Sequence, residues 1–364
     1  MAWSFEAVVT HTGQRLGRLP GTGFTGARSL NGGEGGQVTI PLTDDDWQLT
    51  KAEWDYLLKP TVRTVVACWN NVPVFSGIIW TRKYKWGSGV LQLTLRDVWS
   101  VFEGRTLIGP NSTYPSHSYY RFGPAGLPTL ADRIVRLTQN NGEALDNLPM
   151  EYPASVSGTR EARFYGYNAM TVAEGLEQII TLDGGPDCDF TPAWAGNAFT
   201  WVMGSARDLN ASKQVDINLD GGAAGVDFEL TEDATDIVTR AHVFGEGEGR
   251  ATLSASAAAG GSQEYLTVER IYTGKRTNQL WHLQGWGART VRENSRPVET
   301  ADMSIRIDGT PGLADLVPGM TIRVVAPEDP WLAGRELMMR LAGYSFSQAS
   351  SSVQLDVRLL EEAE

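Results

Sequence analysis

Two segments of the chain, one near its start and one at its end, carry the same order of hydrophobic strands and turns. Residues 64–97 and residues 321–359 each contain a short apolar strand, a turn, a second apolar strand, a loop of small residues and a final alternating strand. Alternation with period two indicates a sheet with one buried face. The pattern predicts two related β-domains with other material inserted between them, although any two antiparallel meanders could look alike by coincidence.

The final strand of each segment predicts which side chains are buried and which are not. The apolar faces, expected to point into the two cores, are Leu91, Leu93 and Leu95 in the first segment and Val353, Leu355 and Val357 in the second. The polar faces are Gln92, Thr94 and Arg96 in the first segment and Gln354, Asp356 and Arg358 in the second. A polar face on an otherwise buried strand is a candidate contact surface, and a simple solvated sheet face is the alternative.

The material between the two segments is mixed in character. We expect a β-rich first domain over residues 1–104, an α+β insertion over 105–204, a second β-domain over 205–250 and 298–364, and an inserted segment with a helix over 251–297. Two capping boxes, Thr50 with Glu53 and Thr171 with Glu174, predict helix starts, because each threonine and glutamate can bond the other's backbone N–H. Residues 109–128 and 254–262 are expected to be irregular. The fold class is therefore mainly β with α+β insertions.

Charge and composition exclude several classes of protein. Lys and Arg total 31 against 43 Asp and Glu, which gives a net charge of −12. A nucleic-acid binder needs a basic face to displace counterions from phosphates, so this balance argues against one. The first residues lack the basic and apolar stretches of a signal peptide, and no apolar run is long enough to span a bilayer. Two distant cysteines predict free thiols in a protein made in a reducing cytosol.

No arrangement of residues in the sequence predicts catalysis, a cofactor or a metal site. Residues 343–347 resemble a nucleophile elbow but lack its final glycine and a following helix. The four histidines are scattered and are better explained by surface or packing positions. The run Asp44, Asp45 and Asp46 lacks the alternating ligands and turn glycine of a calcium loop. A solvated turn before the helix explains it better.

Two further features keep other functions open. Asp183, Asp187 and Asp189 could include a glycosidase pair, although carboxylates so close in sequence usually cap and solvate a turn. Sugar-stacking platforms or ordinary packing could explain the many tryptophans, among them Trp80, Trp86, Trp194, Trp201, Trp281 and Trp286. A host-surface carbohydrate binder and a glycosidase are therefore the alternative functions.

Six short motifs follow one another along the chain, at residues 73–79, 91–105, 171–190, 237–247, 316–323 and 337–360. Each motif is degenerate alone, but their order covers most of the chain. Through these motifs the chain resembles phage tail hub proteins, the group that includes the central hub of contractile baseplates and the tail-tip hub, or minor tail protein, of long non-contractile tails.

This resemblance implies two tail-tube-like β-barrels in each subunit, with inserted domains between them. Three subunits would then give a ring of six barrels that adapts a sixfold tail tube to a threefold tip and surrounds the DNA ejection channel. The implied partners are two further copies of the chain, the tail tube or distal tail ring above, other tip proteins or fibres below, a tape measure protein in the channel, and DNA only in transit. The implied location is the virion, after synthesis in the host cytoplasm.

The resemblance also bears on enzymatic activity and on the polar strand faces. No segment corresponds to an appended peptidoglycan-cleaving domain, so we expect a structural protein rather than a lytic enzyme. The two polar faces become candidates for the channel wall or the subunit boundary. A negatively charged lumen would let DNA slide past without binding.

Overall fold

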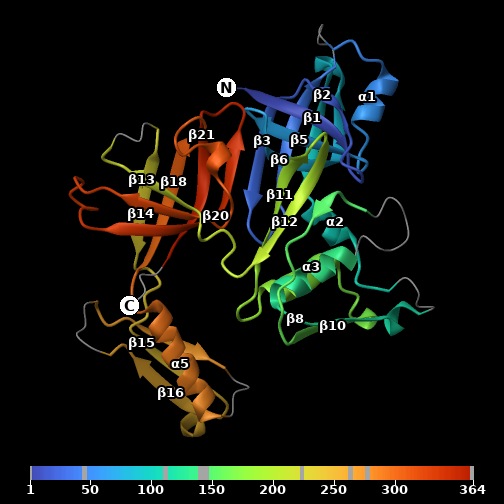
Figure 1. Cartoon of the computed structure of the whole chain (residues 1–364). Coiled ribbons are helices and arrows are strands. Elements are labelled where there is room, and N and C mark those ends of the chain that lie inside the picture. Colours follow the sequence, from blue (N-terminus) through green and yellow to red (C-terminus); the bar gives the residue numbers. More distant parts are fainter. Residues whose placement is uncertain are drawn as a thin grey trace. The chain divides into compact units, whose positions relative to one another are not determined.

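The computed structural model describes residues 2–42, 47–109, 114–137, 147–221, 225–260, 265–274 and 279–360 (Figure 1). The described chain is mainly β with several sheets and small helical insertions, as expected. It divides into two compact units, one of Met1–Asp227 with Met303–Glu364 and one of Phe228–Asp302. None of the described helices is long and apolar enough to cross a membrane.

The first section forms six strands in the spatial order β3-β4-β7-β6-β5-β1, and β2 pairs with the outer edge of β1. Their bounds are β1 (Trp3–Val9), β2 (Arg15–Leu19), β3 (Thr22–Ser29), β4 (Gly35–Pro41), β5 (Arg63–Trp69), β6 (Val72–Lys85) and β7 (Val90–Arg96). Two helices complete the section, α1 (Lys51–Leu57) and α2 (Trp99–Gly104). The predicted capping box of α1 is confirmed, since Thr50 and Glu53 bond each other's backbone N–H.

The last section repeats this strand order as β14-β18-β21-β20-β19-β13. Its strands are β13 (Gln214–Asn218), β14 (Asp227–Asp233), β18 (Val298–Arg306), β19 (Thr321–Val325), β20 (Glu336–Ser347) and β21 (Ser352–Leu359). The outermost strands differ in direction, because β1 runs antiparallel to β5 whereas β13 runs parallel to β19.

The two meanders agree in register as well as in order. The cross-strand row of Thr64, Ile78 and Arg96 has its counterpart in the row of Thr321, Arg340 and Arg358. The register then shifts at the same place in both, between Ile79 and Thr81 of β6 and between Leu341 and Gly343 of β20. A shared bulge at one position of a shared register favours duplication over coincidence.

The predicted burial of the final strands is confirmed. Leu93 and Leu95 of β7 are buried, and so are Val353, Leu355 and Val357 of β21. Leu91, at the start of β7, is half-buried.

The two repeats join edge to edge in one continuous sheet. Residues 343–347 of β20 pair antiparallel with residues 25–29 of β3. Aromatic rings cover this junction, with the Phe346 centroid 5.8 Å from Phe24 and 5.7 Å from Trp3. The junction is therefore both hydrogen-bonded and packed.

The inserted residues between the repeats build a mixed layer. Its strands are β8 (Tyr119–Ala125), β9 (Met150–Glu151), β10 (Arg160–Tyr165), β11 (Asp187–Ala195) and β12 (Ala198–Ala206), and its helices are α3 (Leu127–Leu137) and α4 (Val172–Ile180). The capping box of Thr171 and Glu174 is present at the start of α4. These elements share one hydrophobic core with Val66, Cys68 and Ile78 of the first repeat, so β5 is buried on both faces.

Besides most of β14 and the first half of β18, the second compact unit contains one small sheet and one helix. The sheet has the order β16-β15-β17, formed by β15 (Arg240–Phe244), β16 (Ser254–Ala258) and β17 (Glu269–Thr273). Helix α5 (Leu280–Asn294) contacts β15 and β16, as the lower ribbon of Figure 1 shows. Its core includes Val238, Ala241 and Val291.

Three expectations about local structure were wrong. Within residues 109–128, the structure has strand β8, which pairs with β10. The Ala/Ser-rich residues 254–258 form β16 rather than an irregular excursion. The second β-domain was expected to include all of residues 205–250, but β15 within that range pairs with β16 and β17 instead of with the strands of the second repeat. In the first two cases long-range pairing overrides a composition that favours loops.

Candidate functional site

The polar faces of β7 and β21 hold equivalent positions in the two repeats. Gln92, Thr94, Arg96, Gln354, Asp356 and Arg358 are all exposed. Thr94 lies opposite Thr81 and Asp356 lies opposite Gly343, directly after the shared register shift. The sequence therefore placed both triplets correctly on one face of their strands. Their role as a channel wall or a subunit boundary remains a prediction.

The arginine ends of the two polar faces differ. Arg96 forms an ion pair with Glu103 of α2, and its guanidinium lies 5.9 Å from the centroid of the Trp80 ring. Arg358 lies opposite Arg340, which forms an ion pair with Asp187 of β11. The Arg96 side chain is therefore engaged, whereas no partner is described for the Arg358 side chain.

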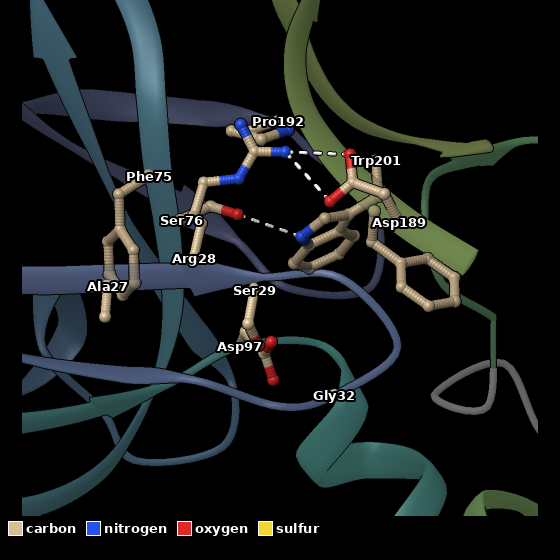
Figure 2. A pocket seen from close by; sticks show the side chains of 11 residues that line it. Ala27, Arg28, Ser29, Gly32, Phe75, Ser76, Asp97, Asp189, Pro192 and Trp201 are labelled. Atoms are coloured by element: carbon tan, nitrogen blue, oxygen red, sulfur yellow. Dashed lines mark hydrogen bonds and ion pairs between the residues drawn. The ribbon is translucent and has the colours of Figure 1, made fainter. Parts of the chain in front are cut away.

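A buried ion pair fastens the inserted hairpin to the junction of the repeats. Arg28 of β3 donates to both carboxylate oxygens of Asp189, at 3.0 and 2.9 Å (Figure 2). Its guanidinium also donates to the Thr191 hydroxyl at 3.2 Å. It also lies 3.3 Å from the Tyr344 hydroxyl of β20. Burial disfavours the charge on Arg28, but Asp189 and Tyr344 outweigh it and raise the pKa of the guanidinium.

Asp187 makes a second link of the same kind. Its carboxylate accepts hydrogen bonds from Arg340 of β20, from the Asn31 amide at 2.8 Å and from the Leu209 backbone N–H at 3.2 Å. Asn31 in turn accepts the backbone N–H of Cys188. The two aspartates thus tie β11 to both repeats.

This arrangement gives Asp187 and Asp189 a structural explanation. Both carboxylates are engaged by arginines, while Asp183 is exposed in a turn. The cavity beside Asp189, which Asp97 and Trp201 also line, has a volume of about 20 Å³ (Figure 2). A water molecule fits such a space and a sugar ring does not.

The tryptophans suggested as sugar platforms differ in burial and in their neighbours. Trp201 is buried and donates to the Ser76 hydroxyl at 2.9 Å, and Trp194 packs against Phe199. Trp286 contacts Tyr272 in the second unit. Trp80, Trp86 and Trp281 are exposed. Packing therefore explains Trp194 and Trp201 directly.

The remaining candidate chemistry is sparse. Burial raises the pKa of Cys68 to about 11 and that of Cys188 to about 12, so both thiols stay protonated at neutral pH. Within the described ranges, no group of three or more His, Cys, Asp or Glu side chains could hold a metal ion. Asp44, Asp45 and Asp46 lie outside the described residues.

Sequence reasoning missed the partners of the two aspartates. Arg28 and Asp189 are 161 residues apart, and Arg340 and Asp187 are 153 apart. No periodicity or motif connects such positions, and only the folded sheet brings them together.

Comparison with known proteins shows a likeness in fold. No family model matches the sequence, and no curated protein matches it. Among solved structures, the tail protein from Neisseria meningitidis MC58 is similar over 99% of this chain and 97% of its own, with a TM-score of 0.53 and 14% identity. The 43 kDa tail protein of prophage MuSo2 from Shewanella oneidensis is similar over 98% of both chains, with a TM-score of 0.55 and 12% identity.

These likenesses extend over nearly the whole of each chain and include the inserted elements. At such low identity they establish the architecture, and the resemblance to phage tail hub proteins is confirmed at the level of fold. The chain has the fold of phage tail proteins.

Proposed function

We propose that the chain is a structural subunit of a phage tail tip or baseplate hub. Three copies form a ring of six similar sheets, which adapts a sixfold tail tube to a threefold tip and surrounds the DNA ejection channel. The single observation that carries this proposal is the repeat itself, in which two meanders of one chain share strand order, register and bulge. The fold likeness to tail proteins supports it.

The repeat resolves the mismatch in symmetry between a trimeric hub and a sixfold tail tube. A trimer with one sheet per subunit offers three docking surfaces to a sixfold tube and leaves half of the tube's contacts unmet. Two equivalent sheets per subunit offer six. The in-chain pairing of β20 with β3 supplies one kind of neighbour contact that such a ring needs.

The partners follow from this position. The tail tube or a distal tail ring docks above, other tip proteins or fibres bind below, a tape measure protein occupies the channel, and DNA passes only in transit. The net charge of −12 suits a channel that phosphates must pass without binding. The inserted sections 105–204 and 251–297 face outward in this arrangement, where tip partners can reach them.

The location is tested by labelling the chain in intact virions. An epitope tag after Leu360 should direct gold particles to the distal end of the tail tube in negative-stain images. Label on the head, along the tube or on detached fibres would contradict a hub. A tagged capsid protein provides the control for antibody access.

The channel role of the polar faces leads to a charge prediction. In Thr94→Lys/Asp356→Lys particles, DNA ejection should slow severalfold, because a positive wall retains phosphates. Ejection is followed by the fluorescence of a DNA-binding dye after receptor triggering. Matched particles with Thr181→Lys/Asp183→Lys gain the same charge at two exposed positions of the inserted section, away from both faces, and should eject at the normal rate. Equal rates in both variants would place Thr94 and Asp356 on an ordinary solvated face.

A further inference from the structure

The in-chain junction defines which edges meet when two repeats lie side by side. In β20, residues 336–340 pair with β19, and residues 343–347 continue past the end of β19 and pair with β3. Strand β3 is the first strand of the neighbouring repeat in the spatial order. The in-chain junction thus gives a rule: the part of the central strand that extends beyond its inner neighbour pairs with the first strand of the next repeat.

The first repeat contains the equivalent central strand, β6. No described strand pairs with the part of β6 that corresponds to the junction. Residues 72–78 of β6 pair with β5, as residues 336–340 of β20 pair with β19. By the shared register, residues 81–85 of β6 correspond to residues 343–347 of β20. Among the described residues, this half of β6 pairs with β7 on one side, and no strand pairs with its other edge.

An aromatic side chain along this unpaired edge of β6 is exposed, whereas its counterpart in β20 is buried. Phe346 of β20 is 4% exposed in the junction, whereas the corresponding Tyr84 of β6 is 54% exposed. Trp86, two residues further on, is 85% exposed. A bare edge with exposed aromatic rings invites another strand to pair with it.

The strand that the rule selects is β14, the first strand of the second repeat. It lies at the end of the strand order, and among the described residues it pairs only with β18. Its sequence carries Asp227, Glu229, Glu232 and Asp233, all exposed. The bare half of β6 carries Arg82, Lys83 and Lys85.

The two edges are therefore complementary in charge as well as in geometry. Arg82 already contacts Asp55 at 2.9 Å, whereas Lys83 and Lys85 have no described ion pair. Phe228 and Leu230 of β14 alternate with the acidic residues and are half-buried. They can meet Tyr84 as Phe24 meets Phe346 in the in-chain junction.

We infer that residues 81–85 of β6 bind strand β14 of a second copy of this chain by antiparallel strand addition. This contact rests on the proposed function, whose ring needs three in-chain junctions and three between chains. The in-chain junction is set by connectivity and is nearly uncharged, since Arg28 is the only charged residue in its paired segments. The junction between chains adds opposite charges, which steer the correct edges together.

Charge reversal and charge exchange test this contact in the full-length purified chain. We expect the wild type to form trimers in sedimentation velocity runs over a concentration series. K83E/K85E and D227K/E229K, each of which changes two side chains on one face of its strand, should each weaken self-association by roughly tenfold to a hundredfold at low salt. The combined variant K83E/K85E/D227K/E229K should recover most of the loss, because it restores opposite charges across the contact.

The matched control is R18E/R207E, which changes the net charge by the same amount as K83E/K85E at two other exposed arginines. It should associate like the wild type. This pairing of edges would be overturned if neither double variant weakened trimer formation. It would also be overturned if the combined variant did not restore the association that the double variants lose. A wild-type chain that stays monomeric throughout would also overturn it, because both edges are present in the isolated chain. The hub proposal is tested separately in virions, so either can fail without the other.

Discussion

Leu93→Asp and Leu355→Asp should each destabilise the protein by about 3–5 kcal/mol, because each places an unpaired carboxylate in a hydrophobic core. Leu93 and Leu355 are 1% and 3% exposed and hold equivalent positions in the two final strands. A loss of this size removes a large part of the free energy of unfolding of an ordinary domain. Urea unfolding followed by tryptophan fluorescence measures the loss.

The neighbouring residues provide matched controls. Gln92→Asp and Gln354→Asp add the same charge one position away, on the exposed face, and should change stability by no more than about 0.5 kcal/mol. The account requires both pairs to behave alike. If Leu93→Asp were severe while Leu355→Asp was tolerated, the two strands would not be equivalent.

Asp189→Leu should cost about 3–5 kcal/mol, since it leaves the Arg28 guanidinium buried without its counter-charge. The side chains of the pair are only 11% and 6% exposed, so water cannot replace the lost partner. The expected result is an earlier urea transition. Glu103→Gln, which breaks the exposed pair with Arg96, is the control and should cost at most about 1 kcal/mol.

A double variant separates the charge from the packing. Arg28→Met with Asp189→Leu removes both charges and keeps apolar volume, so it should recover most of the stability lost in Asp189→Leu. Failure to recover would mean that the hydrogen bonds of Arg28 to Thr191 and Tyr344, rather than the unpaired charge, dominate the energetics of this site.

The local features of the sequence predicted much of this fold. Alternation identified the final strands, and the capping boxes at Thr50 and Thr171 identified the starts of α1 and α4. These signals work because strand burial and helix capping depend on residues within a few positions of one another. They also identified the repeat, although they could not decide between duplication and coincidence.

The features that the sequence did not predict depend on residues that are far apart in the chain. Strand β16 is built from alanine and serine, whose composition favours a loop, and it is held by pairing with β15. The link between Arg28 and Asp189 needs the edge of β3, the hairpin β11–β12 and Tyr344 to meet. The register that establishes the repeat likewise emerges only when strands are paired. The basic run at residues 82–85 was visible in the sequence, but its meaning depends on the bare edge of β6.

The central claim is that three copies of this chain build a ring of six equivalent sheets, and its most direct test is cryo-electron microscopy of the tail end in intact virions, reconstructed without imposed symmetry. The account predicts three copies at the end of the tube, with the sheets of the first and second repeats alternating around one channel. A ring of six copies, a single copy, or a threefold ring in which the second repeats lie away from the channel would contradict it.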